Sequence, residues 1–262
     1  MSRVCSLFSG SKGNSTYIRC GQTSVLIDAG VSARMLNNRL KEYGTDLCDI
    51  NAIFVTHEHS DHIKGLEIIT KYHNIPVFAT EGTIRGMIAA FPELAEADLR
   101  VIGEGEAVGE LSVTAFSTSH DANQSCGFLL CGSDGKKTAV CTDLGYISES
   151  VKCAVRGCDM VIIESNHDVN MLKNGIYPAV LKHRILGMHG HLSNDACAQF
   201  LPELIDCGTT RVILGHISEE NNTLPLALQT STRALNNAGI RVGKDCMIAA
   251  ASRIGIGKMY LL

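Results

Sequence analysis

The chain has 262 residues, close to the upper limit for a single hydrophobic core. Hydrophobic residues make up 45% and charged residues 19%, a soluble globular composition that excludes a disordered, collagenous or coiled-coil chain. The sequence contains no apolar run of about 18 residues that could form a membrane helix, and its N-terminus does not resemble a signal peptide. The 11 cysteines form no CxxC pair, so we expect a reducing cytoplasm and no disulfide framework.

The charge balance is mildly acidic, with 23 basic and 27 acidic residues and a net charge of −4. A protein that holds duplex nucleic acid through its general surface field is normally basic. A nucleic-acid partner would therefore be held here by a local patch or by bound metal.

The N-terminal half predicts a hairpin meander followed by alternating strands and helices. Gly-rich pieces separate the first three strands, and Ser32 is the predicted N-cap of the first helix. The expected strands are Val4–Ser9, Ser15–Cys20, Ser24–Asp28, Ile53–Thr56 and Pro76–Ala79, and the expected helices are Ser32–Tyr43, Ile63 to about His73 and Glu81–Ala90.

The C-terminal half repeats this pattern, with no linker, low-complexity tract or charge run. Two sheets packed together with helices outside, in one domain spanning residues 1–262, fit this order. The expected strands are Leu111–Ser117, Gly127–Leu130, Thr138–Thr142, Met160–Glu164, Arg211–Leu214 and a final strand pair within Asp245–Leu262, and the expected helices are Ser148–Val155, Ile176–Arg184, Asn194–Cys207 and Leu224–Ala238.

A histidine-aspartate cluster follows the strand Ile53–Thr56. Residues i and i+2 of an extended tip point the same way, so His57 and His59 can converge on one ion. Asp61 and His62, where the chain turns into a helix, can face a second ion. Nitrogen and oxygen ligands suit zinc, manganese or iron(II). The alternative is a polar loop with a capping Asp and solvated His, which four metal-competent residues in six positions make improbable.

Three further candidate ligands follow apolar strands: His120, Asp143 and His216. Strand ends at a sheet edge are where α/β-type sheets build their sites. Each residue by itself could equally be a loop residue. Together with the first cluster, they form a specific pattern.

The pattern H-x-H-x-D-H followed by distant His, Asp and His resembles the metallo-β-lactamase-fold hydrolases. The resemblance covers essentially the whole chain and implies a four-layer αββα sandwich of the α/β class. It also implies two divalent metal ions, zinc or manganese with iron possible. By this resemblance, the first ion is bound by His57, His59 and His120, the second by Asp61, His62 and His216, and Asp143 bridges the two.

Two classes within this superfamily fit poorly. Oxygen-reducing di-iron relatives generally carry a carboxylate where His59 stands. Antibiotic-hydrolysing relatives are exported and usually place a Cys where Asp143 stands. Thioester hydrolases of the glyoxalase II type remain, as do phosphodiesterases and nucleases.

Four further segments are similar to the YycJ/WalJ group of small bacterial nucleases. This resemblance implies 5′-to-3′ exonuclease activity on DNA with a free 5′ end, with a suspected role in mismatch repair. A tRNase Z-type RNA nuclease or phosphodiesterase, or a glyoxalase II-like thioester hydrolase, stays open as an alternative. The sequence predicts no oligomeric state. The segments are S-G-S-K-G-N-S at 9–15, E-S-N-H-D at 164–168, G-H-L-S-N at 190–194 and H-I-S-E-E-N-N at 216–222.

Roles in catalysis can be assigned on this basis. Two-metal hydrolysis uses a hydroxide held between the ions, and Asp61 is well placed to accept its hydrogen bond. His191 is the first candidate to protonate the leaving 3′-oxygen and His167 the second. A hairpin turn at 9–15 and a capping or surface role for His191 are the structural alternatives. The candidate substrate contacts are Ser11, Asn14, Asn166 and Ser193.

Overall fold

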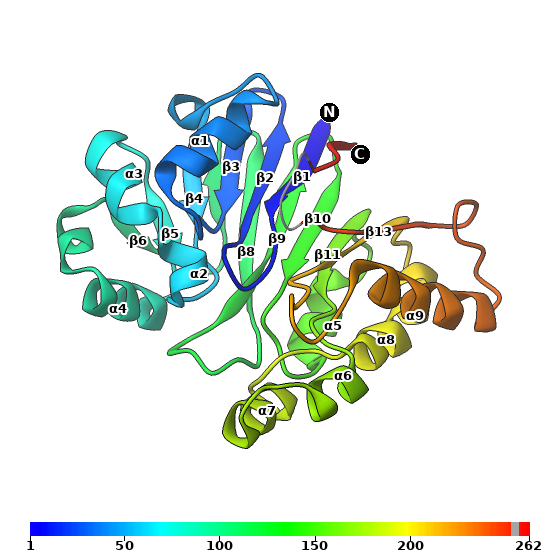
Figure 1. Ribbon diagram of the computed structural model, residues 1–262. Coiled ribbons are helices and arrows are strands. Elements are labelled where there is room, and N and C mark those ends of the chain that lie inside the picture. The colour runs from blue at the N-terminus through cyan, green and yellow to red at the C-terminus, as the bar shows by residue number, and fades with distance from the viewer. Residues whose placement is uncertain (253–256) are drawn as a thin grey trace. The chain divides into compact units, whose positions relative to one another are not determined.

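The structure is a computed structural model that describes residues 1–252 and 257–262. Two compact units can be distinguished (Figure 1). The first comprises Met1–Ala115, Ala122–Lys136 and Ser252–Leu262, and the second comprises Phe116–Asp121 and Lys137–Ala251. The expectation of one domain stays a prediction. Within the described part of the chain, no helix is both long and apolar enough to cross a membrane.

The first unit is built on a mixed sheet with strand order β14-β1-β2-β3-β4-β5-β6. The hairpin meander is confirmed, because β1 pairs antiparallel with β2, and β2 pairs antiparallel with β3. The strands β3 to β6 then run parallel. The bounds are β1 (Ser2–Phe8), β2 (Ser15–Cys20), β3 (Thr23–Ile27), β4 (Ala52–Phe54), β5 (Val77–Ala79), β6 (Leu99–Val101) and β14 (Tyr260–Leu261).

Helices pack beside this sheet and bury its apolar core (Figure 1). Ser32 caps the first helix as predicted, accepting a hydrogen bond from the amide of Met35. The helices are α1 (Ala33–Lys41), η1 (Leu47–Asp49), α2 (Ser60–Ile63), α3 (Leu66–Tyr72), α4 (Glu81–Ala90) and η2 (Pro92–Glu96), and this unit also contains β7 (Glu106–Val108), most of β8 (Leu111–Ser117) and β9 (Cys126–Gly132).

The single helix predicted from Ile63 to about His73 is wrong. The segment is divided into α2 and α3 at Gly65, whose amide donates to the carbonyl of Ala29. A Cβ atom on Gly65 would lie 2.4 Å from the carbonyl oxygen of Val31, so only glycine allows this approach. The first of the two helices, α2, begins at Ser60 and carries Asp61 and His62.

The second unit contains four parallel strands in the order β13-β12-β11-β10. Because they are parallel, the carboxyl ends of β10, β11 and β12 meet at one edge, where the loops that follow them can build a site. The bounds are β10 (Lys137–Cys141), α5 (Glu149–Val155), β11 (Met160–Glu164), α6 (Val169–Asn174), α7 (Ala179–Leu186), α8 (Asn194–Asp206), β12 (Arg211–Gly215), α9 (Leu224–Asn237) and β13 (Met247–Ala250).

Two predicted elements near the C-terminal half need correction. The helix expected from Ile176 begins at Ala179, because Pro178 disfavours a helical conformation in the residue before it. The final strands are not a pair, since β13 joins β12 and β14 joins β1. Residues 253–256 of that predicted tail lie outside the described residues. The short elements β6, β7 and α6 were not predicted.

Candidate active site

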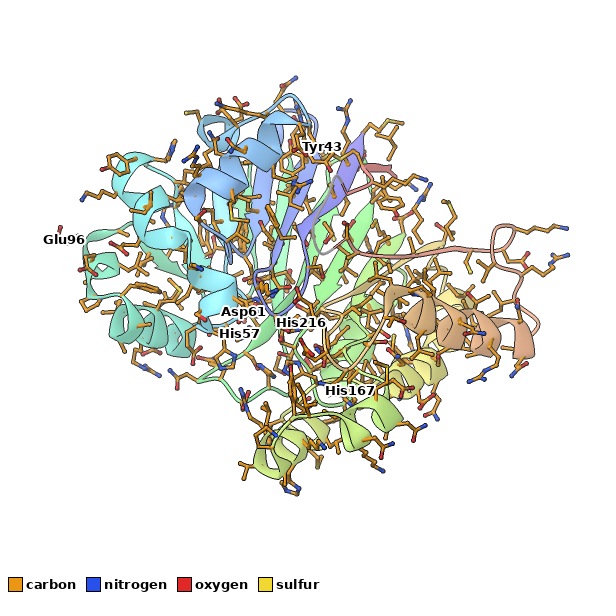
Figure 2. All side chains as sticks on the ribbon, in the orientation of Figure 1. Tyr43, His57, Asp61, Glu96, His167 and His216 are labelled. Atoms are coloured by element: carbon orange, nitrogen blue, oxygen red, sulfur yellow. The ribbon has the colours of Figure 1, made fainter. Side chains whose placement is uncertain are left out.

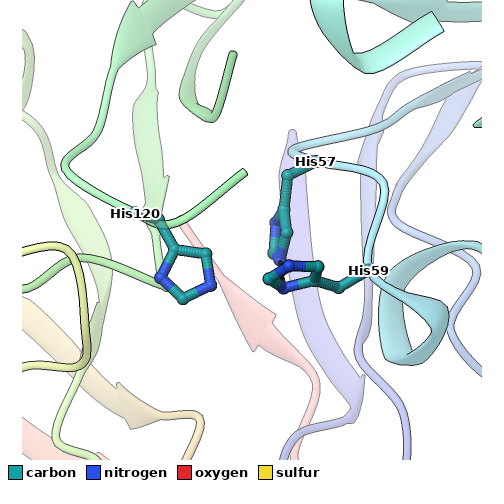
Figure 3. A group of neighbouring side chains, drawn as sticks. All are labelled: His57, His59 and His120. Atoms are coloured by element: carbon teal, nitrogen blue, oxygen red, sulfur yellow. Dashed lines mark hydrogen bonds between the residues drawn. The ribbon is translucent and has the colours of Figure 1, made fainter. Parts of the chain in front are cut away.

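His57 and His59 converge at the end of β4, as the alternation of an extended strand predicts. Nε2 of His57 lies 3.1 Å from Nδ1 of His59, and the two rings meet edge to face (Figure 3). Two nitrogen ligands of one tetrahedral zinc ion, each about 2.0–2.1 Å from the metal, are separated by about 3.3 Å. The spacing of these two nitrogens therefore fits two ligands of the same ion.

His62 is buried and anchored from one side by a carboxylate at the end of β3. Its Nδ1 lies 2.8 Å from Oδ2 of Asp28, and Oδ1 of Asp28 accepts from the amide of Thr56 at 2.8 Å. The hydroxyl of Thr56 lies 3.0 Å from Nδ1 of His57. A metal-binding histidine usually gives its other ring nitrogen to such a partner, which fixes the ring and its tautomer. Asp28 and Thr56 thus hold the rings of His62 and His57 through Nδ1, which leaves Nε2 as the candidate ligand atom.

Asn14 contacts two of the candidate ligand residues. Its side-chain Nδ2 donates to Oδ2 of Asp61 at 3.2 Å and lies 3.1 Å from Nε2 of His62. The backbones of Asn14 and Asp61 are also joined by a 2.8 Å hydrogen bond. Gly30 allows this close approach, because a Cβ atom there would lie 1.7 Å from the carbonyl oxygen of Asp61. In Figure 2, His57 and Asp61 lie near each other beside α2.

His120 in the second unit is oriented by a backbone carbonyl. Its Nδ1 donates to the carbonyl oxygen of Gly190 at 3.0 Å, and its Nε2 lies 3.8 Å from Oδ1 of Asp143. Burial lowers the pKa of His120 below its usual value, against the opposing charge of Asp143. A neutral imidazole with a fixed tautomer is the form that binds a metal.

Left-handed backbone conformations occur at three strand ends. Among the described residues, Asp28 (φ 64°), Asp143 (φ 58°) and His216 (φ 48°) are the non-glycine residues with positive φ. Such conformations cost about 1–3 kcal/mol each and persist where surrounding structure imposes them, often at functional sites. All three residues follow strands and carry metal-competent or metal-orienting side chains.

Glu164, at the end of β11, contacts two histidine rings and two backbone amides of the second unit. Its Oε1 lies 2.9 Å from Nδ1 of both His191 and His216, and its Oε2 accepts from the amides of Leu144 and Leu192. Burial alone would raise the pKa of this carboxyl, but the charge of His191 and the hydrogen bonds from both histidines outweigh it and lower the pKa.

Glu164 is therefore ionised, and its carboxylate fixes the rings of His191 and His216 through their Nδ1 atoms. Ligand atoms of Asp143, Glu164, His191 and His216 all lie within 4.8 Å of one another, so this group of side chains has the composition and spacing to hold a metal ion.

A buried amide network joins the loops that carry these residues. The hydroxyl of Ser165 donates to Oδ1 of Asn194, and Nδ2 of Asn194 donates to Oδ1 of Asn222. Nδ2 of Asn222 in turn donates to the carbonyls of Ser165 and Asn166. The segments E-S-N-H-D, G-H-L-S-N and H-I-S-E-E-N-N are thus locked together by their Ser and Asn side chains.

The candidate substrate contacts have varied surroundings. Asn166 is buried and donates to the carbonyl of His216 at 2.8 Å, and Ser193 caps α8 by accepting from the amide of Ala196. Ser11 is exposed. His167 is buried, and neither of its ring nitrogens has a hydrogen-bond partner within residues 1–252 and 257–262. Substrate contact and catalysis by these residues stay predictions.

Asp28 and the anchoring role of Glu164 were missed from the sequence. Glu164 is the last residue of β11, and Asp28 directly follows β3 as His216 directly follows β12, so the same strand-end signal was available. A count of candidate ligands does not reveal these two carboxylates, because they contact the candidate histidines through Nδ1.

Comparisons with known proteins agree with this geometry. A family model described as "Beta-lactamase superfamily domain" matches residues 23–217. The chain is 35% identical over 240 residues to Exodeoxyribonuclease YycJ of Bacillus anthracis, covering 91% of this chain and 90% of the relative. It is also 35% identical to Exodeoxyribonuclease WalJ of Streptococcus pneumoniae strain D39, with the same coverage. The crystal structure of the metallo-β-lactamase fold protein YhfI from Bacillus subtilis matches with a TM-score of 0.73 at 15% identity, covering 100% of both chains.

The chain therefore belongs to the β-lactamase superfamily. Within it, the chain is a member of the YycJ/WalJ group, because the identity to these relatives extends over nearly the whole length. The predicted fold class, an α/β sandwich of the metallo-β-lactamase type, is confirmed, as is the prediction of a metal-dependent hydrolase. The His/Asp clusters in this fold suggest divalent metals.

Proposed function

We propose that this protein is a two-metal phosphodiester hydrolase that removes nucleotides from DNA in the 5′-to-3′ direction. The observation that carries the proposal is the way the candidate histidines are anchored. Nδ1 of His57, His62, His120 and His216 each lies against an oxygen of its own unit, so Nε2 is the ring nitrogen of each that is left to serve as a ligand atom. The exodeoxyribonuclease names of two relatives support DNA as the substrate class. The 5′-to-3′ direction is the expectation that the sequence resemblance implied, and it is part of this proposal.

The donor set fits two divalent ions. In this proposal the first ion is held by His57, His59 and His120, the second by Asp61, His62 and His216, and Asp143 is shared. Imidazole and carboxylate donors without thiolate suit zinc or manganese, with iron possible. The 3.1 Å between the nitrogens of His57 and His59 supports the first group.

Bound there, the two ions would stabilise the negative charge of the phosphodiester and lower the pKa of water enough to supply a nucleophile near neutral pH. The chain's own residues then do three things. Asp61 orients the nucleophile, and its carboxylate is held for that purpose by Nδ2 of Asn14. His191 donates a proton to the leaving 3′-oxygen. Glu164 fixes His191 through Nδ1, so that Nε2 is the atom that gives the proton.

His191 is preferred over His167 because its side chain is 18% exposed and so reaches solvent. Burial lowers the pKa of His167 to about 4, which leaves that ring neutral and a weak proton source at pH 7. Ser11, Asn166 and Ser193 are the proposed contacts to substrate phosphates, together with Asn14. A cytoplasmic location and a part in mismatch repair complete the proposal.

End-labelled oligonucleotides test the activity. The purified protein, supplied with manganese, is incubated with DNA labelled at the 5′ or at the 3′ end. We expect early release of labelled mononucleotide from the 5′ end only, and no release in a chelator. Faster release from the 3′ end, or cleavage only of RNA or of a thioester such as S-lactoylglutathione, would overturn the proposal in favour of the other hydrolases of this superfamily.

Two variants separate the roles of the residues. His191→Ala is expected to slow turnover by about 10²–10⁴-fold without loss of metal, because it removes only general acid catalysis. Asp143→Ala is expected to lose metal as well as activity, because both ions depend on it. Unchanged turnover in His191→Ala would refute the proton-donor role.

A further inference from the structure

Exposed apolar side chains gather on one short stretch of the second unit. Among the described residues, the most exposed large hydrophobic side chains of the chain are Ile176 (87%) and Val180 (83%), and Met188 (66%) and Leu186 (42%) follow within the same stretch. This stretch contains α7, which lies at the outer edge of the second unit in Figure 1. Clustered exposed apolar residues on a folded chain mark an interaction site.

The same stretch is basic in an acidic chain. Residues 169–194 contain Lys173, Lys182 and Arg184, three histidines and no Asp or Glu. The segment therefore carries +3 within a chain whose net charge is −4, so that the rest of the chain carries −7. An anionic partner is accordingly attracted to this part of the surface and repelled by most of the remainder.

The apolar and basic side chains share one face of α7. Val180, His183 and Arg184 stand at positions i, i+3 and i+4, which lie side by side on a helix. Arg184 pairs with Asp121, the neighbour of His120, and its side chain stays 51% exposed. This pair lowers the net positive charge of the face and also joins it to the candidate site.

The C-terminal end of α7 adds an aromatic ring. A Cβ atom on Gly145 would lie 2.2 Å from the carbonyl oxygen of Met188, so the two backbones are in close contact. Tyr146, the next residue, is 41% exposed. The opposite end is bounded by negative charge, because burial and then the charges of Glu220 and Glu219 raise the pKa of the Tyr177 hydroxyl.

We propose that a surface formed by Tyr146, Ile176, Val180, His183, Arg184 and Met188, here called the α7 surface, binds single-stranded nucleic acid. The proposal rests on the proposed function and names the form of its substrate. Single strands are held by aromatic rings on which bases stack, combined with cations beside the phosphates. Tyr146 supplies such a ring here, and the exposed aliphatic side chains can cover the apolar faces of unstacked bases. The bases of a duplex are already stacked on each other, and an acidic chain lacks the field to hold a duplex by its backbone alone. The strand would pass from the α7 surface to His120 and His191.

Paired apolar substitutions test the α7 surface. The variant Ile176→Ser/Val180→Ser removes two exposed side chains that are four residues apart. The control Ile68→Ser/Tyr72→Ser removes two from α3 with the same spacing, where Ile68 is 46% and Tyr72 71% exposed. Each protein is assayed with a 20-residue oligothymidylate and with bis(p-nitrophenyl) phosphate, a diester too small to reach both the α7 surface and the site. Binding of the fluorescent oligonucleotide is also measured by anisotropy in chelator, where no cleavage occurs.

We expect the α7 variant to raise KM and Kd for the oligonucleotide about tenfold or more, because two apolar side chains no longer bury surface against it. Turnover of the small diester should stay within twofold of wild type. The control should match wild type in every assay. Tyr146→Ser should also raise KM, and Tyr146→Phe, which keeps a ring for stacking, should restore it. If the double variant folds poorly, the comparison of Tyr146→Ser with Tyr146→Phe decides whether the α7 surface binds the oligonucleotide.

Several results would overturn the inference. KM and Kd for the oligonucleotide unchanged in the α7 variant would show that the surface does not bind the strand. A wild-type dimer that becomes a monomer in the variant, measured by sedimentation velocity, would make the surface a contact between copies of the chain. If the wild-type protein cleaves neither substrate, the proposed function fails, whereas the anisotropy titration still decides whether the α7 surface binds.

Discussion

Glu164→Gln is the substitution that tests most sharply how the second unit prepares its ligands. The carboxylate receives ring nitrogens on Oε1 and two backbone amides on Oε2, all within 3.1 Å. Glutamine has the same size but only one oxygen. Its amino group must face either the amides of Leu144 and Leu192, which are donors themselves, or Nδ1 of the two histidines.

Both orientations damage the site. The first leaves buried amide donors unsatisfied, at a cost of about 1–3 kcal/mol each. The second requires Nδ1 of His216 to accept, which moves the ring proton to Nε2, the proposed ligand atom. Loss of such an anchoring carboxylate typically lowers metal affinity about 10–100-fold. We therefore expect a 10–100-fold weaker affinity for at least one ion.

The assay is competition between the protein and a chromophoric zinc chelator, with circular dichroism to verify folding. Glu203→Gln, an exposed position on α8, is the matched control and should bind as wild type does. Metal affinity in Glu164→Gln within twofold of the wild-type value would refute the reasoning that this carboxylate fixes the ligand tautomers.

Three further predictions concern stability, each measured by urea denaturation in chelator. Asn222→Ala should lower the free energy of unfolding by about 2–4 kcal/mol, because it leaves several buried amide and carbonyl groups unsatisfied, and a loss below 1 kcal/mol would contradict the network. Gly65→Ala should cost about 1–3 kcal/mol, since its Cβ must displace the backbone of Val31, and equal stability would show that α2 and α3 do not need this glycine. His167 has a folded pKa of about 4, below the unfolded value of about 6.5. Its contribution to the free energy of unfolding is therefore complete above pH 6.5 and is lost as the pH falls toward 4. Between pH 7 and pH 5, the free energy of unfolding of His167→Gln should therefore fall by about 2 kcal/mol less than that of wild type. The same pH dependence of unfolding free energy in both proteins would exclude a buried neutral ring.

Much of the candidate site could be predicted because it obeys local rules. His57 and His59 converge through the two-residue repeat of an extended chain, and Asp143 and His216 were found from the apolar strands that precede them. These signals need only a few neighbouring residues. The surroundings of Asn14 are different, because its contacts with Asp61 and His62 join segments about 47 residues apart in the chain and depend on the backbone at Gly30.

The fold was predictable to a similar degree. The strand Ser15–Cys20 and the cap at Ser32 follow from turn and capping chemistry next to them. The break at Gly65 does not, because a glycine within an apolar-periodic segment does not reveal that another backbone will pack against it. The pairing of β14 with β1 likewise depends on contacts between the two ends of the chain, which no local pattern specifies.

Metal content tests the central claim most directly. Wild-type protein and Asp143→Ala are each supplied with zinc or manganese, freed of unbound metal and measured by elemental analysis. We expect two divalent ions per wild-type chain and the loss of both in the variant. A wild-type chain that retains no ion, or a variant that retains two, would contradict it.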